Sequence, residues 1–322
     1  MNIAALPSSG PAREALRAKG QFWTPEWIAD AMTGYVLADG ASQLLDPAVG
    51  AGVFFRSALR RKPSCDLAGF DVDADALSEA RKCGLSARDL RGVRLADFLS
   101  HPHRQTFEAI TANPPYIRHH RLSAARKDEL RRYATRRMGF ALDGRIGLHA
   151  YFLLKALELL RPGGRLAFIL PADVCEGISA KPLWNWIAAR YRLDMVITFA
   201  PEAAAFPGVD TNALIFFLRA ADPVSEFDWV RVLETDPPGF DDWAAGRRTS
   251  NVPEGVCIVR RQLDEGLRTG LSRPPFTPQD DGLYLRDFAR VMRGIATGAN
   301  EFFTMTDVRR RELGLAENGF AA

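Results

Sequence analysis

Short apolar segments that alternate with helical segments constrain the fold of this chain more than any other feature. The predicted strands cover residues 43–46, 67–72, 93–95, 107–112 and 165–170. Helical patterns precede or separate them at residues 27–37, 53–61, 74–83 and 151–160, the last stopped by Pro162, Gly163 and Gly164. Such alternation is typical of a parallel sheet covered by helices on both faces. The chain is therefore predicted to be a doubly wound α/β protein.

Polar and glycine residues follow the ends of the predicted strands, where sheets of this kind bind ligands. Asp46 ends the first strand and is followed by Gly50 and Gly52, where a ligand can approach the backbone. Asp71 ends the second strand, in a position suited to the two hydroxyls of a ribose. Asp97 and Phe98 follow the third strand and offer an acceptor and a ring to a purine. These residues predict a nucleoside cofactor.

The structural alternative for each of these acids is a helix N-cap, which we expect for Asp73. The glycine loop lacks the third glycine of the dinucleotide fingerprint, and Phe54 and Phe55 follow instead. Glycine spacing alone leaves NAD open, but no set of residues for hydride transfer is evident. S-adenosylmethionine is therefore favoured over NAD.

The tetrapeptide Asn113-Pro114-Pro115-Tyr116 follows the strand predicted at 107–112. The Asn113 side-chain carbonyl and the Pro114 main-chain carbonyl are two acceptors that can hold one amino group, and the prolines fix the local φ angles. Tyr116 adds a flat face for stacking. Two acceptors draw the nitrogen lone pair out of conjugation, which makes the amine a better nucleophile. The alternative is that the proline pair merely ends a strand.

These motifs together resemble those of the amino-group DNA methyltransferases, in particular N6-adenine enzymes whose cofactor motifs precede the catalytic one. The resemblance covers residues 19–219 and, more weakly, 283–305; besides the tetrapeptide, it rests on residues 20–25, 45–54, 71, 97–98 and 206–215. It implies a doubly wound, mostly parallel, seven-stranded Rossmann-like methyltransferase sheet. It also implies a cofactor-binding set of Gln21, Thr24, Pro25, Asp46, Pro47, Ala48, Gly50, Gly52, Asp71, Val72, Asp97, Phe98 and Asn113.

The resemblance further implies methyl transfer to the N6 amino group of an adenine flipped out of double-stranded DNA. Asn113, Pro114, Pro115 and Tyr116 are then catalytic, and Phe206 stacks on the second face of the base. A cytosine-C5 enzyme needs a Pro-Cys nucleophile, and none of the four cysteines follows a proline. Cytosine-N4, protein-glutamine and RNA-adenine methylation stay open, as does a truncated remnant that binds cofactor or DNA without turnover.

One position departs from the family pattern. His149 stands near a slot where the family often has tyrosine. Nothing in the proposed chemistry requires an imidazole, so His149 is assigned a structural role.

A basic segment directly follows the tetrapeptide. Eight Lys and Arg residues between positions 118 and 137 face only Asp128 and Glu129 in sequence. The predicted phosphate contacts are Arg118, Arg121, Arg131, Arg132, Arg136 and Arg137. Such contacts supply salt-dependent affinity without sequence information. The alternative is a solvated helix face.

The domain plan that follows is a catalytic domain at 1–221, a turn-rich connecting segment at 222–282 and the start of a target-recognition domain at 283–322. We expect that recognition domain to be incomplete, with a separate recognition subunit or a cognate endonuclease as partners. The expected setting is a bacterial restriction-modification or epigenetic system.

Composition limits the remaining options. The formal net charge is only +3, so any nucleic-acid surface must be local. Cys65, Cys83, Cys175 and Cys257 form no Cys-x-x-Cys pair, which favours reduced thiols in a cytoplasm and argues against a metal site. No run of 18 apolar residues and no secretory signal is visible, so no membrane association is expected.

Overall fold

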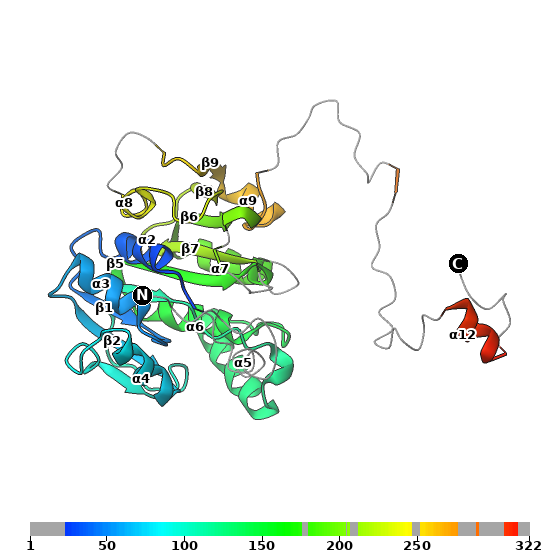
Figure 1. Ribbon diagram of the computed structural model, residues 1–322, viewed down its shortest axis with the longest axis horizontal. Helices are drawn as coiled ribbons and strands as arrows, with labels where there is room; N and C mark the ends of the chain where they lie inside the picture. The colour runs from blue at the N-terminus through cyan, green and yellow to red at the C-terminus, as the bar shows by residue number, and fades with distance from the viewer. Residues whose placement is uncertain are drawn as a thin grey trace. The chain divides into compact units, whose positions relative to one another are not determined.

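The computed structural model describes residues 23–175, 180–203, 205–206, 212–246, 252–275, 288–289 and 306–314. The chain divides into two compact units, Met1–Phe276 and Thr277–Ala322. The first unit contains the sheet and every site discussed below (Figure 1). In the second unit, the described helix is α12 (Asp307–Glu312), capped by the Thr306 side chain.

The first unit is built on one nine-stranded sheet with the order β3-β2-β1-β4-β5-β7-β6-β8-β9. The strands are β1 (Gln43–Asp46), β2 (Asp66–Asp71), β3 (Val93–Leu95), β4 (Phe107–Ala112), β5 (Leu160–Pro171), β6 (Arg192–Phe199), β7 (Ala213–Arg219), β8 (Glu226–Val232) and β9 (Val256–Gln262). Strands β3 to β5 of this order run parallel, whereas β7 is antiparallel to both β5 and β6, and β9 is antiparallel to β8. The sheet is mixed and mostly parallel.

Helices cover both faces of the sheet (Figure 1). They are α2 (Glu26–Val36), α3 (Val53–Arg61), α4 (Ala74–Lys82), α5 (Ala124–Met138), α6 (Leu148–Glu158), α7 (Ala180–Ala188), α8 (Phe240–Ala244) and α9 (Leu263–Thr269). Short 3₁₀ turns occur at His119–Arg121, Ala172–Cys175 and Pro201–Ala203.

Two hydrophobic cores result, one on each face. Leu44 and Ala109 pack with α2, α3 and α8, whereas their strand neighbours Leu45 and Ile110 pack with α5, α6 and α7. Successive strand residues point to opposite faces, so burial on both faces requires continuous apolar strands rather than alternating ones. The doubly wound arrangement predicted from the sequence is confirmed.

The predicted number of strands was wrong, because the sheet has nine rather than seven. Strands β8 and β9 lie within residues 222–282, where turn signals predicted a connecting segment. Those signals are real but brief: Gly239, in the left-handed region at φ 75°, begins helix α8 between the two strands. Much of the 283–322 segment lies outside the described residues.

The predicted stop at residues 162–164 is also different in the structure. Strand β5 begins at Leu160 and runs through these residues, with Gly163 at φ 77°. The pairing with β4 shifts register there, since Phe107 pairs with Leu160 and Ala109 with Arg165. The turn residues form a bulge at the start of the strand.

Among the described residues, no helix combines the length and the apolar character needed to cross a membrane.

Candidate active site

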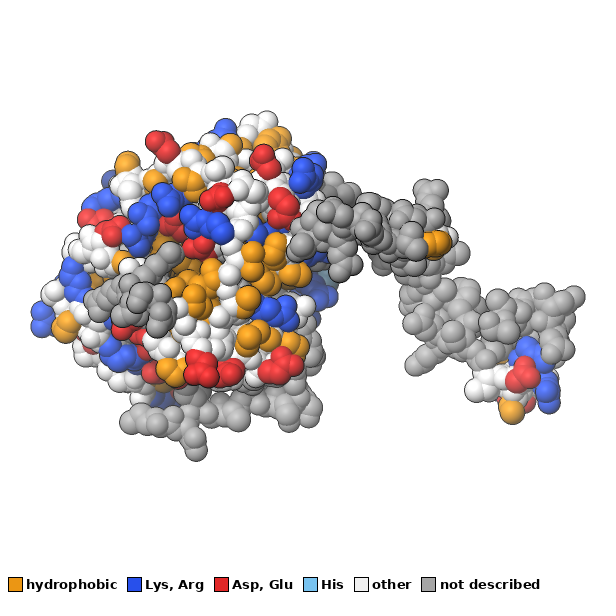
Figure 2. Space-filling view, turned by 90° about the horizontal axis from the view of Figure 1, so that it is seen from above, with side chains coloured by type: hydrophobic (Ala, Val, Ile, Leu, Met, Phe, Trp, Pro, Cys, Tyr) orange, Lys and Arg blue, Asp and Glu red, His pale blue; other side chains and the backbone are white. Residues whose placement is uncertain are grey.

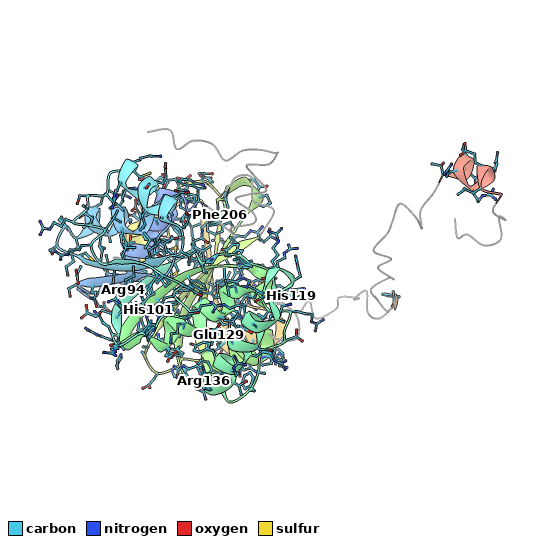
Figure 3. The ribbon with its side chains drawn as sticks, turned by 90° about the horizontal axis from the view of Figure 1, so that it is seen from below. Arg94, His101, His119, Glu129, Arg136 and Phe206 are labelled. Atoms are coloured by element: carbon cyan, nitrogen blue, oxygen red, sulfur yellow. The ribbon has the colours of Figure 1, made fainter. Side chains whose placement is uncertain are left out.

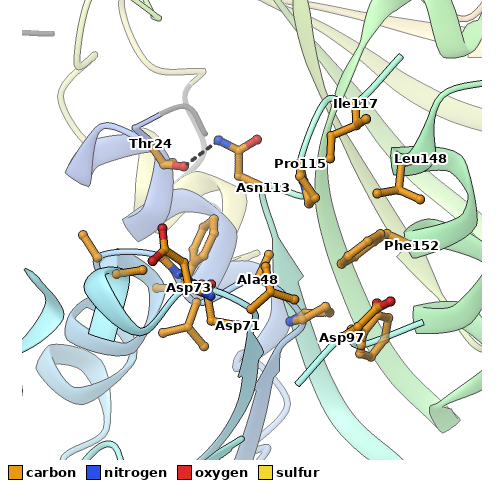
Figure 4. A pocket seen from close by; sticks show the side chains of 18 of the residues that line it. Thr24, Ala48, Asp71, Asp73, Asp97, Asn113, Pro115, Ile117, Leu148 and Phe152 are labelled. Carbon is orange, nitrogen blue, oxygen red and sulfur yellow. Dashed lines mark hydrogen bonds between the residues drawn. The ribbon is translucent and has the colours of Figure 1, made fainter. Parts of the chain in front are cut away.

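A cavity of about 600 Å³ opens beyond the carboxyl ends of β1, β2, β3 and β4 (Figure 4). All four strands run parallel, so their ends meet at one edge of the sheet. The predicted site residues that line the cavity are Thr24, Pro47, Ala48, Gly50, Asp71, Val72, Asp97, Phe98, Asn113 and Pro115. The strand-end rule therefore brought most of the predicted cofactor set together.

Other predicted residues lie beneath or beside the cavity. Asp46 is fully buried, Gly52 caps helix α3, and Pro25 precedes helix α2. Gln21 lies outside the described residues.

Several lining residues were not predicted, and they come mainly from segments after the tetrapeptide. Ile117, Leu122 and Arg126 line the cavity, as do Leu148 and Phe152 of α6. Apolar residues of a helix carry no sequence signal that distinguishes a ligand wall from a protein core.

Two glycines shape the loop between β1 and α3. Gly50 and Gly52 have φ angles of 52° and 72°, a region that strains residues with a side chain. At Gly52 a Cβ atom would also lie 2.3 Å from Leu85 Cδ1. The loop can therefore pass close under a ligand without side chains in the way.

Asp71 binds this loop as well as lining the cavity. Its Oδ2 accepts a hydrogen bond from the Gly50 main-chain N–H at 2.7 Å, and its Oδ1 accepts one from Asp73 N–H at 2.8 Å. Burial raises the pKa of the Asp71 carboxyl above its usual value, and the two backbone hydrogen bonds oppose that shift. Asp73 itself caps α4 by accepting from Asp75 N–H, which confirms the predicted N-cap.

Asp46 lies directly below the loop. Its Oδ1 accepts from Ala48 N–H at 3.0 Å, and its Oδ2 has no hydrogen-bond partner in the described part of the chain. Burial raises the pKa of Asp46 to about 8, so the group is mainly a neutral carboxylic acid at pH 7. This acid stabilises the turn after β1 rather than presenting charge to a ligand.

The amide of Asn113 is oriented by the chain's N-terminal segment. Asn113 Nδ2 donates a hydrogen bond to Thr24 Oγ1 at 3.1 Å (Figure 4). This bond turns the side-chain carbonyl of Asn113 away from Thr24. Pro114 is buried and Pro115 lines the cavity, so the tetrapeptide forms the rim at the end of β4.

Tyr116 does not line the cavity but packs beside it. Its ring meets the ring of His149 edge to face, with centroids 5.8 Å apart. Burial raises the pKa of Tyr116, so its phenol stays neutral. His149 is 4% exposed, and burial lowers its pKa to about 4.

His149 is held in a tight space. A Cβ atom on Gly147 would lie 2.4 Å from His149 Cε1, and Asp173 Oδ1 is 3.5 Å from His149 Nε2. The imidazole is therefore neutral, buried and adjacent to the tetrapeptide, and it is not part of the cavity wall.

Phe206 lies apart from helix α5, as its position relative to Glu129 and Arg136 shows (Figure 3). Its half-buried ring packs edge to face on Phe199, with centroids 5.8 Å apart. It does not line the cavity. Residues 207–211, which follow it, lie outside the described residues.

Basic residues after the tetrapeptide fall into two groups. Arg118, Arg121, Arg131, Arg132 and Arg136 are exposed. Arg137 is different, because its Nη2 donates to the Tyr191 hydroxyl at 3.1 Å and its guanidinium lies 5.4 Å from the Trp186 ring. On the face in Figure 2, by contrast, basic and acidic side chains are interspersed.

No cluster of three His, Cys, Asp or Glu side chains with metal-binding geometry occurs within the described ranges.

Comparison with known proteins identifies related methyltransferases. A protein-family model described as the Eco57I restriction-modification methylase matches residues 71–206. The Type II methyltransferase M.AccI of Acinetobacter calcoaceticus is 26% identical over 313 residues, covering 92% of this chain and 55% of that protein. M.XamI of Xanthomonas campestris pv. amaranthicola is 28% identical over 290 residues, covering 87% of this chain and 52% of that protein.

The fold has solved counterparts. One is a type I restriction-modification methyltransferase subunit from Streptococcus thermophilus, with a TM-score of 0.57 and 17% identity over 80% of this chain and 60% of that chain. The chain spans about half the length of the curated relatives it matches. The resemblance to DNA methyltransferases of restriction-modification systems, inferred from the motifs, is confirmed by these matches.

Proposed function

We propose that this chain transfers a methyl group from S-adenosylmethionine to the N6 amino group of an adenine in DNA, within a restriction-modification system. One observation carries the proposal. The Asn113-Pro114-Pro115-Tyr116 tetrapeptide lies at the end of β4, on the rim of a cavity built from four strand ends. An amine held by that rim is next to whatever the cavity binds.

The cavity fits a nucleoside with a cationic side chain. Its volume lies in the range of small-molecule sites. Asp71 is placed for ribose hydroxyls, Asp97 and Phe98 for a purine, and the main chain around Gly50 for close approach. Asp73, Asp75 and Glu79 add negative charge to the wall, which suits a sulfonium. S-adenosylmethionine supplies an electrophilic methyl group there.

Residues of the chain then orient the acceptor amine. The Asn113 carbonyl and the Pro114 main-chain carbonyl hold its two hydrogens, and Thr24 fixes which end of the Asn113 amide faces the amine. Because an in-line displacement depends on positioning, no general base is needed. The methylated nitrogen releases its extra proton to water.

The acceptor base must leave the duplex to reach this rim. We assign Tyr116 and Phe206 to stacking on the extruded base and the exposed arginines of α5 to DNA phosphates. Double-stranded DNA, a separate recognition subunit and a cognate endonuclease are the proposed partners.

The test is direct. The purified chain is incubated with tritiated S-adenosylmethionine and unmethylated genomic DNA, and the labelled nucleoside is identified; Asn113→Ala serves as the control. Label on N6-methyladenine supports the proposal, whereas label on N4-methylcytosine replaces adenine with cytosine. Label only on parallel RNA or glutamine-peptide substrates overturns the DNA assignment. Absence of label in all three, with cofactor binding demonstrated, contradicts catalysis by this chain.

A further inference from the structure

Arg126 reaches from the first turn of α5 to the wall of the cavity. Its main-chain N–H donates to the capping Ser123 Oγ at 3.2 Å, which fixes the start of the helix. Its side chain is 19% exposed and lines the cavity, unlike the exposed Arg131, Arg132 and Arg136 of the same helix. Arg126 therefore belongs to the cavity rather than to the basic surface.

Three groups fix its guanidinium. Arg126 Nη2 donates to Asp97 Oδ2 at 2.5 Å, and Nη1 donates to Ser100 Oγ at 2.6 Å and to Glu129 Oε2 at 2.7 Å. A planar guanidinium that is held at both nitrogens transmits its orientation to its partners. An exposed ion pair contributes little, but this one is largely buried and lies at a ligand wall.

Asp97 is thereby left with a defined acceptor. Its Oδ2 accepts from Arg126 and from Ser100 Oγ at 3.1 Å, and its Oδ1 accepts from Leu99 N–H at 2.9 Å. A carboxylate has about four acceptor sites, two on each oxygen. Both sites on Oδ2 are used, so Oδ1 retains the site that can receive one further N–H.

We propose that Arg126 is a positioning residue that holds Asp97 Oδ1 for the exocyclic amino group of the cofactor's purine. This inference rests on the proposed function. The selectivity for adenine over a 6-oxo purine then depends on a residue of helix α5, not only on the strand-end residues. A 6-oxo purine presents an acceptor to Asp97 Oδ1, which leaves both oxygens without a donor between them.

Calorimetric titration of the full chain tests this with two probes, S-adenosylhomocysteine and S-inosylhomocysteine. We expect the wild type to prefer the adenine compound by about tenfold or more, the scale of one hydrogen bond to a charged group. Arg126→Gln should reduce that preference to about twofold or less, and Arg126→Lys should restore part of it. Arg131→Gln, an exposed site on the same helix, should keep the wild-type ratio. Ligand-free melting curves check that all variants are folded.

Two results overturn the inference while leaving the proposed function intact. One is an unchanged preference in Arg126→Gln. The other is an equal loss of affinity for both probes, which makes Arg126 a general structural residue. Failure of the wild type to bind either probe removes the proposed function and this inference with it.

Discussion

Asn113 joins two parts of the molecule, since its amide donates to Thr24 near the start of α2 while its position ends β4. Asn113→Ala removes one acceptor for the target amine, and we expect kcat to fall by about 10²–10³-fold, as for other preorganised polar groups. Affinity for S-adenosylhomocysteine should change only a few-fold. Thr24→Val, which removes only the orienting bond, should cost less. Wild-type turnover in Asn113→Ala would contradict the assigned role.

Asp71 serves both ligand and loop. Asp71→Ala should weaken cofactor binding by roughly 1–3 kcal/mol, the scale of lost charged hydrogen bonds, and should also loosen the loop by removing the acceptor of Gly50 N–H. Asp71→Asn, which keeps one acceptor, should fall between this variant and the wild type. Equal affinities in calorimetry would remove Asp71 from the site.

His149 makes stability depend on pH. Its pKa is about 4 in the fold and about 6.5 when unfolded, so the unfolded chain binds a proton first as pH falls. This contribution is therefore complete above pH 6.5 and is lost between pH 6.5 and 4. Urea unfolding should show about 2 kcal/mol lost from this group between pH 7.5 and 5. His149→Phe should remove that part of the pH dependence, and His120→Gln should keep it; the opposite pattern would disprove the explanation.

At the scale of elements, α5 presents a basic face at Arg131, Arg132 and Arg136, whereas Arg137 packs on Trp186. Reversing the three exposed arginines to Glu should flatten the dependence of DNA affinity on salt, because fewer counterions are released. Reversing Arg81, Lys82 and Arg88, which are exposed around α4, is a control of equal charge. Equal slopes for the two triple variants would make the α5 face an ordinary solvated surface.

The elements also show what the sequence could establish. Strands β1, β3 and β4 were predicted at their observed bounds, because apolar runs end abruptly at Asp46, Ala96 and Asn113. Strands β8 and β9 were missed, since nearby proline and glycine turns obscured two seven-residue strands. Helix α6 begins at Leu148 rather than at residue 151, because a helix start without a side-chain cap leaves little trace in sequence.

The candidate site divides in the same way. Residues at strand ends, such as Asp71 and Asn113, could be predicted because parallel strands must meet at one edge. Arg126 and Phe152 could not, since their place in the wall depends on how α5 and α6 pack on the sheet. Phe206 was predicted beside the base, and that assignment stays a prediction.

For the whole molecule, all lining residues of the cavity fall between Trp23 and Phe152, within the unit Met1–Phe276. A chain ending after Phe276 should therefore bind S-adenosylhomocysteine within about twofold of the full chain, since 1.4 kcal/mol would already be tenfold. Calorimetry and thermal melting check this. A large loss of affinity with an unchanged melting temperature would show that the second unit contributes to the site.

The contacts of α2 have a consequence in time. Its Trp27 ring lies 5.9 Å from that of Phe240, and its Tyr35 hydroxyl donates to Asp194 at 2.6 Å. Synthesis at about 5–20 residues per second separates Trp27 from Phe240 by roughly 10–40 s. Thr24, which orients Asn113, directly precedes α2. A nascent chain thus emerges with its catalytic tetrapeptide translated long before the helix beside it can dock, so the enzyme is assembled from its two ends inward and stays inactive on the ribosome until the final strands arrive.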